Sequence, residues 1–290
     1  MDIAEAVREF LVDHTARGSS PFTITYYRRT LNNVLRDWLS CEVQELNTFT
    51  VNRALAAMAD RGVKPATLAS ADRALRGFTA WLKGVDLIHK DPMQGRKRPK
   101  LRPEPKQVLS HGEIVALFAA VKADKRHAAR NTAILYLLLS TGLRAGELVN
   151  LTLSDIDWDT GLLTVKGKTG LGTVPVDRRT LQILRRYITH SRKATIPQVF
   201  VYAGKPLSPD GLGQLIHRIA HRAGIDRPVG PHILRHTFAT AFIENGGDAF
   251  SLKRILRHTT MYTSLMYVHQ STGSIRQKME STTLFRDIHI

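Results

Sequence analysis

The sequence has almost no cysteine: Cys41 is the only one in 290 residues. A single thiol forms no intrachain disulfide and no thiolate metal cluster, which excludes the disulfide-stapled secreted domains and fits a reducing cytoplasm. The opening "MDIAEAVREF" contains acidic residues and lacks an apolar centre, so no secretory signal is predicted. The longest apolar run, "AILYLLL" from Ala133, is too short to span a bilayer. It predicts a buried helix in a soluble protein with no membrane partner.

Acidic residues are also scarce. The chain has 25 Asp and Glu against 42 Lys and Arg, which gives a net charge of +17 and a pI near 10.3. A protein with such an excess of positive charge usually binds a polyanion, most often nucleic acid. The alternative is a basic protein from a highly charged proteome. The residues are 43% hydrophobic and no low-complexity tract is present, so disorder is not expected. A chain of this length predicts two folded domains.

The first 90 residues predict a bundle of about four helices. In "TITYYRRTLNNVLRDWL" the apolar residues Tyr27, Leu31, Val34 and Trp38 recur at helical spacing. Another helix is expected from Pro65 to the glycine at position 84, because proline suits a first turn and glycine a helix end. The segment "VNRALAAMADRG" between them and the opening segment supply the other two helices.

A proline-rich basic segment follows, "DPMQGRKRPKLRPEPK", residues 91–106. Its four prolines oppose regular structure, and its six basic side chains cannot sit in a core. We therefore predict a helical domain over residues 1–90, a solvated linker over residues 91–107 and a second domain over residues 108–290. A basic linker between two domains can also track a phosphate backbone.

The second domain is predicted to combine helices with a small sheet, so the fold class is mostly α with two domains. A capping box, Ser110 with Glu113, starts a helix. The segment "GLLTVKGKTGLGTVPV" reads as two β-branched strands around a Gly/Lys turn, and helices return from Arg178 apart from a short "VFVY". The "GKTG" at Gly167 lacks the upstream glycine of a nucleotide-binding loop, so no nucleotide cofactor is expected.

Four fragments carry the candidate catalytic residues. They are "TGLRAGEL" with Arg144, "VKGKTG" with Lys168, "PHILRHTF" with His232 and Arg235, and "RHTTMYTSLMYVHQ" with His258 and two tyrosines. Taken singly, each has an ordinary structural explanation. An arginine at a helix start commonly pairs with a glutamate three residues later, and a lysine in a turn is commonly solvated.

The histidines His232 and His236 are four apart on an expected helix, a spacing that suits metal ligands. However, Ile233 occupies the place of the glutamate in the HExxH pattern, and no acidic third ligand is in sight. We therefore expect no metal site, and prefer His232 and Arg235 as neighbours on one face.

Taken together, the fragments suit metal-free transesterification on nucleic acid. The carboxylate cage that divalent metals prefer in phosphoryl transfer is missing. Guanidinium groups match the non-bridging oxygens of a phosphodiester and stabilise its pentavalent transition state. A lysine can protonate a leaving alkoxide, a histidine can accept a proton from a phenol, and a tyrosine can form a covalent intermediate.

The order Arg144, Lys168, His232-x-x-Arg235, His258 and Tyr267 resembles the tyrosine recombinase (phage integrase) family. "TGLRAGEL" is similar to the family's first arginine box, "HILRHTFAT" to its second, and "LRHTTMYTSLMYVH" to its "LGHxxxxTTxxYxH" pattern. There are two departures: Arg257 stands where the family usually has glycine, and the short hairpin offers Lys166 as well as Lys168. Lys168 is preferred because "KTG" matches the family's common form, and Lys166 stays open.

Two tyrosines compete for the role of nucleophile. On one continuous helix Tyr262 would lie on the same face as His258, four residues away, while Tyr267 would point elsewhere. A new helix capped by Thr259 or Thr260 would end that continuity, and residues five apart on it lie about 140° around the axis from each other. The family pattern selects Tyr267 and leaves Tyr262 for packing or DNA contact.

The resemblance implies a role for each residue and a partner for the protein. Arg144 and Arg235 would bind the scissile phosphate, Lys168 would protonate the 5′ oxygen, His232 would act as acid and base near the phenol, and His258 would hydrogen-bond a non-bridging oxygen. It implies a SAM-like helical domain that clamps DNA, an α+β catalytic domain, and no need for ATP or metal. The partners would be double-stranded DNA with inverted-repeat core sites and three further copies, a tetramer on two duplexes.

Three other functions are weighed against this one. They are a type IB topoisomerase, a catalytically silent DNA-binding protein of the same fold, and a metal-dependent nuclease using His232, His236 and His258. The resemblance implies a cytoplasmic, nucleoid-associated protein that integrates and excises DNA or resolves dimers, with these roles left open. The tail after Tyr267 is expected to dock on a neighbouring subunit or to fold back on its own core.

Overall fold

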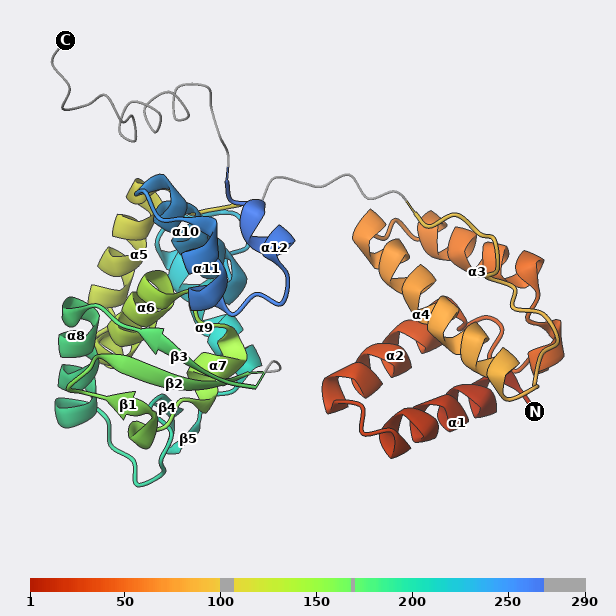
Figure 1. The fold of residues 1–290 in the computed structure, drawn as a ribbon, viewed down its shortest axis with the longest axis horizontal. Helices are drawn as coiled ribbons and strands as arrows, with labels where there is room; N and C mark the ends of the chain where they lie inside the picture. Colours follow the sequence, from red (N-terminus) through yellow and green to blue (C-terminus); the bar gives the residue numbers. More distant parts are fainter. Residues whose placement is uncertain (100–106, 168–169, 269–290) are drawn as a thin grey trace, which may run out of the picture. The chain divides into compact units, whose positions relative to one another are not determined.

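The computed structural model describes residues 1–99, 107–167 and 170–268 (Figure 1). The chain divides into two compact units, Met1–Glu104 and Pro105–Ile290. The described part is mostly helical with two small sheets, as the composition and periodicity predict. Within the described ranges, none of the helices has both the length and the apolar character that crossing a bilayer requires.

Residues 1–99, the described part of the first unit, form a bundle of four α-helices, which confirms the predicted number. They are α1 (Ile3–Ala16), α2 (Pro21–Val34), α3 (Thr48–Asp60) and α4 (Pro65–Gly84), with a 3-10 turn at Val43–Glu45. The predicted bounds of α4 are correct, because proline occupies its first turn and Gly84 its last position. Ser20 and Asn47 cap α2 and α3 by accepting hydrogen bonds from backbone N–H groups of the first turn.

Aromatic rings fill the centre of this bundle. Phe10 is 2% exposed, and its ring meets the edges of Tyr27, Phe78 and Trp81 at centroid distances of 4.9 to 5.5 Å. Such edge-to-face pairs add to the apolar area that the four helices bury. Of the residues whose spacing predicted this helix, Leu31 and Val34 are buried on α2, whereas α2 ends at Val34 and Trp38 lies in the turn beyond it.

The start of the basic segment packs on the first unit. Met93 is 1% exposed, and its carbonyl accepts a hydrogen bond from Arg76 on α4. Asp72, 2% exposed, forms ion pairs with Arg76 and with Arg96. The backbone near residues 93–96 is thereby fixed to α4.

The second unit packs helices against one face of a three-stranded antiparallel sheet, and Leu163, Val165 and Val174 of that face are buried (Figure 1). Its helices are α5 (His111–Lys122), α6 (Ala128–Thr141), α7 (Ala145–Asn150), α8 (Arg178–His190), α9 (Pro209–Arg222), α10 (Pro231–Glu244), α11 (Ala249–Leu256) and α12 (Met261–Leu265). Its strands are β1 (Ile156–Asp157), β2 (Leu162–Gly167), β3 (Gly170–Pro175), β4 (Val201–Tyr202) and β5 (Lys205–Pro206), with a 3-10 turn at Leu153–Asp155. The predicted capping box of α5 and the β2–β3 hairpin are both present.

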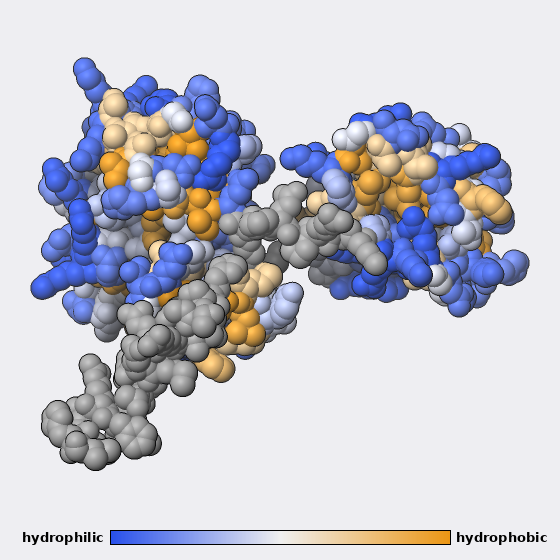
Figure 2. Space-filling model, turned by 90° about the horizontal axis from the view of Figure 1, so that it is seen from above, coloured by the Kyte–Doolittle hydropathy of each residue, from blue (hydrophilic) through white to orange (hydrophobic). Residues whose placement is uncertain are grey.

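Helix α6 runs through the core of this unit, as the apolar run predicted. Ile134, Leu135, Leu137 and Leu138 are all 0% exposed, so the helix is covered on most of its circumference. On the face of the molecule in Figure 2, hydrophilic residues predominate and the apolar residues form separate patches. Because α6 is buried, its C-terminal end holds the turn that follows it in a fixed position.

The chain bends sharply between α11 and α12. Arg257 adopts a left-handed conformation (φ 52°, ψ 49°), and Thr260 precedes the first residue of α12, which confirms the predicted helix break. The expectation that both tyrosines lie on the restarted helix is wrong: α12 ends at Leu265, and Tyr267 lies in the turn beyond it. The last turn tightens, because the Tyr267 N–H bonds the carbonyl three residues earlier rather than four.

Candidate functional site

A left-handed turn between α6 and α7 places the first candidate arginine. Gly142 has φ +61°, and a Cβ there would lie 2.5 Å from a ring carbon of Phe238, so only glycine fits. Two residues later Arg144 caps α7. Its backbone N–H donates to Glu147 Oε2 at 2.8 Å, and its Nη1 donates to Oε1 at 2.8 Å. The ion pair predicted for this helix start is confirmed.

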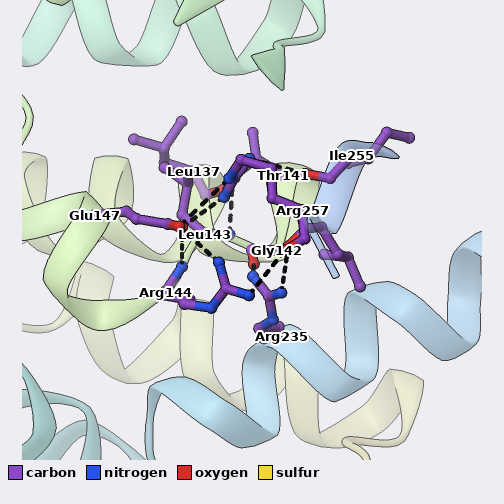
Figure 3. Close-up of polar contacts among 10 residues, drawn as sticks. Leu137, Thr141, Gly142, Leu143, Arg144, Glu147, Arg235, Ile255 and Arg257 are labelled. Atoms are coloured by element: carbon purple, nitrogen blue, oxygen red, sulfur yellow. Dashed lines mark hydrogen bonds and ion pairs between the residues drawn. The ribbon is translucent and has the colours of Figure 1, made fainter. Parts of the chain in front are cut away.

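Arg235 on α10 reaches the same turn from another helix. Its guanidinium donates to the Gly142 carbonyl at 2.5 Å and to the Leu256 carbonyl at 2.6 Å, and the residue is only 5% exposed (Figure 3). Burial, together with the positive charges of Arg144 and Arg257, lowers the pKa of Arg235 to about 10. The group still carries its charge at neutral pH.

The two arginines form one positively charged cluster. Figure 3 shows the guanidinium groups of Arg144 and Arg235 close together, below the turn that contains Gly142. Arg144 Nη2 also donates to the carbonyl of Arg257 at 3.1 Å. Three separate segments of chain therefore meet here: the α6–α7 turn, α10 and the end of α11. Guanidinium groups held this way suit the binding of a phosphodiester.

Glu147 is a member of this cluster that the sequence marked only as an ion-pair partner. The residue is 3% exposed, and Arg257 Nη2 donates to its Oε2 at 2.5 Å. Burial by itself would raise the pKa of this carboxyl. The hydrogen bonds from the Arg144 backbone and the Arg257 side chain outweigh burial, and the pKa is lowered. A charged carboxylate is therefore enclosed between two arginines.

Tyr267, the predicted nucleophile, is buried near the second arginine. It is 4% exposed, whereas Tyr262 is 73% exposed on α12. The phenol oxygen lies 2.5 Å from Nδ1 of His236. Burial raises the pKa of Tyr267, opposed by the charge of Arg235. A phenol in this setting stays protonated and needs a base to react.

His258 also lies beside the tyrosine ring. The two rings are nearly parallel, with an interplanar angle of 9° and a centroid distance of 6.4 Å. His258 Nδ1 also lies 2.8 Å from the Ser264 hydroxyl. Two histidines, His236 and His258, thus lie beside the tyrosine. The sequence suggested His236 only as a possible metal ligand. Its contact with Tyr267 could not be predicted from a local pattern, because the two residues are 31 positions apart in the chain.

The remaining predicted site residues lie at the margin of the cluster. His232 is exposed at the second position of α10, one turn before His236. Lys168 lies outside the described residues, and Lys166 is exposed near the end of β2. The turn end of the hairpin approaches the cluster, because a Cβ at Gly167, the last residue of β2, would lie 2.9 Å from Glu147 Oε1.

Within residues 1–99, 107–167 and 170–268, no group of three or more His, Cys, Asp or Glu side chains could hold a metal ion. The cations that the cluster offers to an anion are the guanidinium groups of Arg144 and Arg235. The arrangement combines these cations with a buried phenol and adjacent imidazoles. Such a set can bind a phosphodiester, stabilise negative charge that develops on it, and attack its phosphorus with tyrosine.

Comparison with protein families gives two matches. The model described as "Phage integrase family" matches residues 107–273, and the model described as "Phage integrase, N-terminal SAM-like domain" matches residues 9–84. The first match spans every residue of the cluster described above. The second spans most of the helical bundle of the first unit.

Known proteins resemble the chain over nearly its whole length. Tyrosine recombinase XerC of Xylella fastidiosa is 32% identical over 262 residues, which cover 88% of each chain. Tyrosine recombinase XerD of Staphylococcus haemolyticus is 29% identical over 271 residues, 90% of this chain and 92% of the relative.

Two solved structures share the fold. The Tn1549 transposon integrase in complex with a circular intermediate DNA has a TM-score of 0.78 at 20% identity, covering 98% of this chain and 100% of its own. A lambda integrase dimer bound to a COC′ core site has a TM-score of 0.76 at 18% identity, covering 91% and 97%.

Proposed function

This chain belongs to the phage integrase family, and on that premise we propose that its arginine cluster and buried tyrosine exchange DNA strands. The chain is a tyrosine site-specific recombinase, which cuts and rejoins DNA through a 3′-phosphotyrosyl intermediate. The names of its relatives favour this activity over that of a type IB topoisomerase. The residues that we assign to the reaction are Arg144, Lys168, His232, Arg235, His258 and Tyr267.

The two arginines bind the scissile phosphate. Arg144 and Arg235 present two guanidinium groups from different helices, and backbone carbonyls fix the orientation of Arg235. Charge that develops on the non-bridging oxygens during attack is stabilised by donors that need no reorganisation. His258, beside the tyrosine ring, donates the further hydrogen bond to a non-bridging oxygen.

The tyrosine attacks the phosphorus. As the bond between its phenol oxygen and phosphorus forms, the bond from phosphorus to the 5′ oxygen breaks. The phenol proton passes to a histidine of α10, and the 5′ oxygen takes a proton from Lys168. His232 is the acid and base that the family pattern assigns, and His236 contacts the phenol in this structure. The later attack of a 5′-hydroxyl reverses these transfers.

The observation that carries this assignment is the burial of Tyr267 beside His236, His258 and Arg235. Tyr262, the alternative nucleophile, points into solvent. Burial keeps the phenol away from water and from unwanted attack on other groups. A tyrosine so enclosed, beside two arginines, suits covalent catalysis better than it suits simple packing.

The DNA partner and the assembly follow from the same family. We assign double-stranded DNA with inverted-repeat core sites, clamped by the bundle of residues 1–90, the basic linker 91–107 and the catalytic domain 108–290. Four copies on two duplexes would exchange strands in pairs. The relatives' structures with a circular intermediate DNA and with a core site support a DNA partner. The tail segment with Leu284 and Phe285 lies outside the described residues, and its truncation after Ser281 is expected to weaken synapsis.

The decisive experiment compares wild type with Tyr267→Phe and Tyr262→Phe on a nicked suicide substrate. The target site is first recovered by pull-down from the host's DNA. Wild type and Tyr262→Phe are expected to form a covalent protein–DNA band on a denaturing gel, and Tyr267→Phe to form none. The reaction is run with EDTA throughout, because the cations of the site are arginines.

Each other outcome contradicts a stated part of the proposal. If only Tyr262→Phe loses the band, the assignment of the nucleophile is wrong. If chelation alone abolishes the band, the metal-free mechanism is wrong. If wild type binds the site tightly and forms no band, the chain is a DNA-binding protein with the fold of a recombinase.

A further inference from the structure

Arg257 is the residue of the cluster whose conformation most calls for an explanation. It joins α11 to α12 with φ 52° and ψ 49°, in the left-handed region that glycine occupies at no steric cost. It is one of three residues other than glycine with positive φ in the described part of the chain. A long side chain retained in such a conformation indicates an interaction that compensates for the strain.

The side chain of Arg257 is committed to Glu147. It is 12% exposed, with Nη2 at 2.5 Å from Oε2 and Nε at 3.4 Å from Oε1. Its Nη1 donates to the Ile255 carbonyl at 2.8 Å. The backbone carbonyl of Arg257 has a different task, because it accepts the hydrogen bond from Arg144 Nη2. Removal of the side chain would therefore leave the carbonyl contact with Arg144 in place.

The Glu147–Arg257 pair also lies against the hairpin. A Cβ at Gly172 on β3 would lie 2.8 Å from Cδ of Arg257, and a Cβ at Gly167 on β2 would lie 2.9 Å from Glu147 Oε1. Gly167 and Gly172, on neighbouring strands near the turn of the hairpin, thus lack side chains where the pair approaches. The pair connects α7, the α11–α12 turn and the hairpin in one contact.

The charges of the cluster show what this pair accomplishes. Glu147 carries one negative charge between Arg144 and Arg257, and its side chain is 2% exposed. Without a second cation, the whole charge of the carboxylate would act on Arg144 in a region that water screens poorly. Arg144 would then attract a phosphate less strongly.

We propose that Arg257 is a positioning residue that neutralises Glu147 and so leaves the charge of Arg144 available to the scissile phosphate. The proposal rests on the proposed function, since it concerns the same phosphate site. Arg257 itself need not touch DNA, because its guanidinium faces Glu147 and the Ile255 carbonyl. It acts through the carboxylate, and that dependence is testable.

The test is a double-mutant cycle of full-length wild type, Arg257→Gly, Glu147→Gln and the double variant. The single-turnover rate of adduct formation on the suicide substrate is measured beside the DNA dissociation constant. Arg257→Gly is expected to slow adduct formation about 10- to 100-fold, the scale of one charge-assisted hydrogen bond, with affinity within about threefold. The double variant is expected to form the adduct at least about fivefold faster than Arg257→Gly, because a neutral amide at position 147 no longer offsets the positive charge of Arg144.

Two further variants separate positioning from bulk charge. Arg257→Lys keeps the positive charge and is expected to lose less rate than Arg257→Gly. Arg254→Ala removes an exposed charge from the same helix end and is expected to stay within about threefold of wild type. A double variant as slow as Arg257→Gly, or an equal loss in Arg254→Ala, would overturn the proposal.

Failure of the proposed function has a different signature. In that case wild type binds DNA and forms no adduct, and the cycle is then measured by thermal unfolding of the same four proteins. Because Glu147 and Arg257 form a pair, the Tm shift of the double variant is expected to differ by more than about 2 °C from the sum of the two single-variant shifts. Additive shifts would overturn the pairing itself, whatever the enzyme's activity.

Discussion

Gly142 is the residue on which the geometry of the site depends most. It ends α6 in a left-handed conformation, and its carbonyl accepts the hydrogen bond that orients Arg235. A Cβ there would lie 2.5 Å from Phe238 Cδ1 and 2.6 Å from Leu256 Cδ2. Both neighbours belong to helices that carry or support the site, so a side chain at this position would displace α10 and α11.

We therefore expect Gly142→Ala to destabilise the second unit by about 2–4 kcal/mol, from overpacking together with left-handed strain. The measurement is the urea midpoint of that unit's unfolding transition. Gly146→Ala is the matched control, because nothing lies within 4 Å of its Cβ position. It lies within α7, so it is expected to be neutral or to stabilise by about 0.5–1 kcal/mol. Equal effects of the two variants would contradict the steric account.

Glu147 gives a pH dependence with a defined sign. Its pKa is lowered from the ordinary 4.5, because hydrogen bonds from Arg144 and Arg257 outweigh its burial. A lowered folded-state pKa contributes stability above pH 4.5 that is lost as the pH falls through the folded value. Glu147→Gln is expected to cost on the order of 1–3 kcal/mol at pH 7.

Below pH 4.5 the difference between wild type and Glu147→Gln is expected to shrink, because protonation removes the charge that the amide lacks. Urea midpoints at pH 3 to 7 measure this. Glu244→Gln, at the exposed end of α10, is the control for a simple loss of charge. A difference that grew on acidification would mean that Glu147 is not the ionised partner of the two arginines.

At the scale of elements, the order of helices around the tyrosine decides which phenol is buried. α11 and α12 are separated by the left-handed Arg257, and α12 ends at Leu265 before the tyrosine. Tyr267 therefore leaves the helix and turns toward α10, where His236 lies. Tyr262 remains on the helix and points outward. On one continuous helix, Tyr262 and not Tyr267 would lie on the same face as His258.

Asp72 fixes α4 to the segment that leaves the first unit. Its side chain is 3% exposed and pairs with Arg76 and Arg96, whose side chains are 24% and 26% exposed. Asp72→Ala would leave two arginines without their carboxylate. Because both are partly solvated, we expect a loss of about 2–3 kcal/mol, less than the roughly 3–5 kcal/mol of a fully buried pair.

The measurement for Asp72→Ala is thermal unfolding of the first unit in the full-length chain. Asp37→Ala is the control, since the Arg36–Asp37 pair is about half exposed on both sides. It is expected to cost less than about 1 kcal/mol. A small effect of Asp72→Ala would show that Met93 and its neighbours are held by apolar packing alone.

For the whole molecule, the charge of +17 sets the salt dependence of DNA binding. Each phosphate neutralised releases counterions and contributes about −0.9 to the slope of log K against log salt. We expect affinity for a duplex core site to fall at least about 100-fold between roughly 50 and 200 mM salt. Fluorescence anisotropy with the core site and a scrambled duplex measures both slopes.

The two duplexes are expected to share a similar slope and to differ in affinity, because phosphate contacts carry no sequence information. A shallow slope with the core site would mean that the positive charge is not directed at the backbone of DNA. The two units are both expected to contribute, since the match to the family extends over each of them.

The sequence by itself determined the fold class and pointed to the residues that we propose for the site. Periodicity and cap residues located α4, the capped start of α5 and the β2–β3 hairpin, because these depend on neighbours a few residues apart. The order of Arg144, the His232–Arg235 pair, His258 and Tyr267 indicated the chemistry, because the short segments around them resemble the arginine and tyrosine boxes of the tyrosine recombinase family.

Only the tertiary structure decided which of these groups touch. His236 meets Tyr267 across 31 positions, and Arg257 meets Glu147 across 110. The end of α12 before Tyr267 likewise depends on packing at the α11–α12 turn, and no local pattern predicted it. Contacts between distant positions arise from how helices pack, whereas sequence patterns report the residues within a turn or two. The pairing of charges and the burial of the phenol are therefore properties of the folded chain.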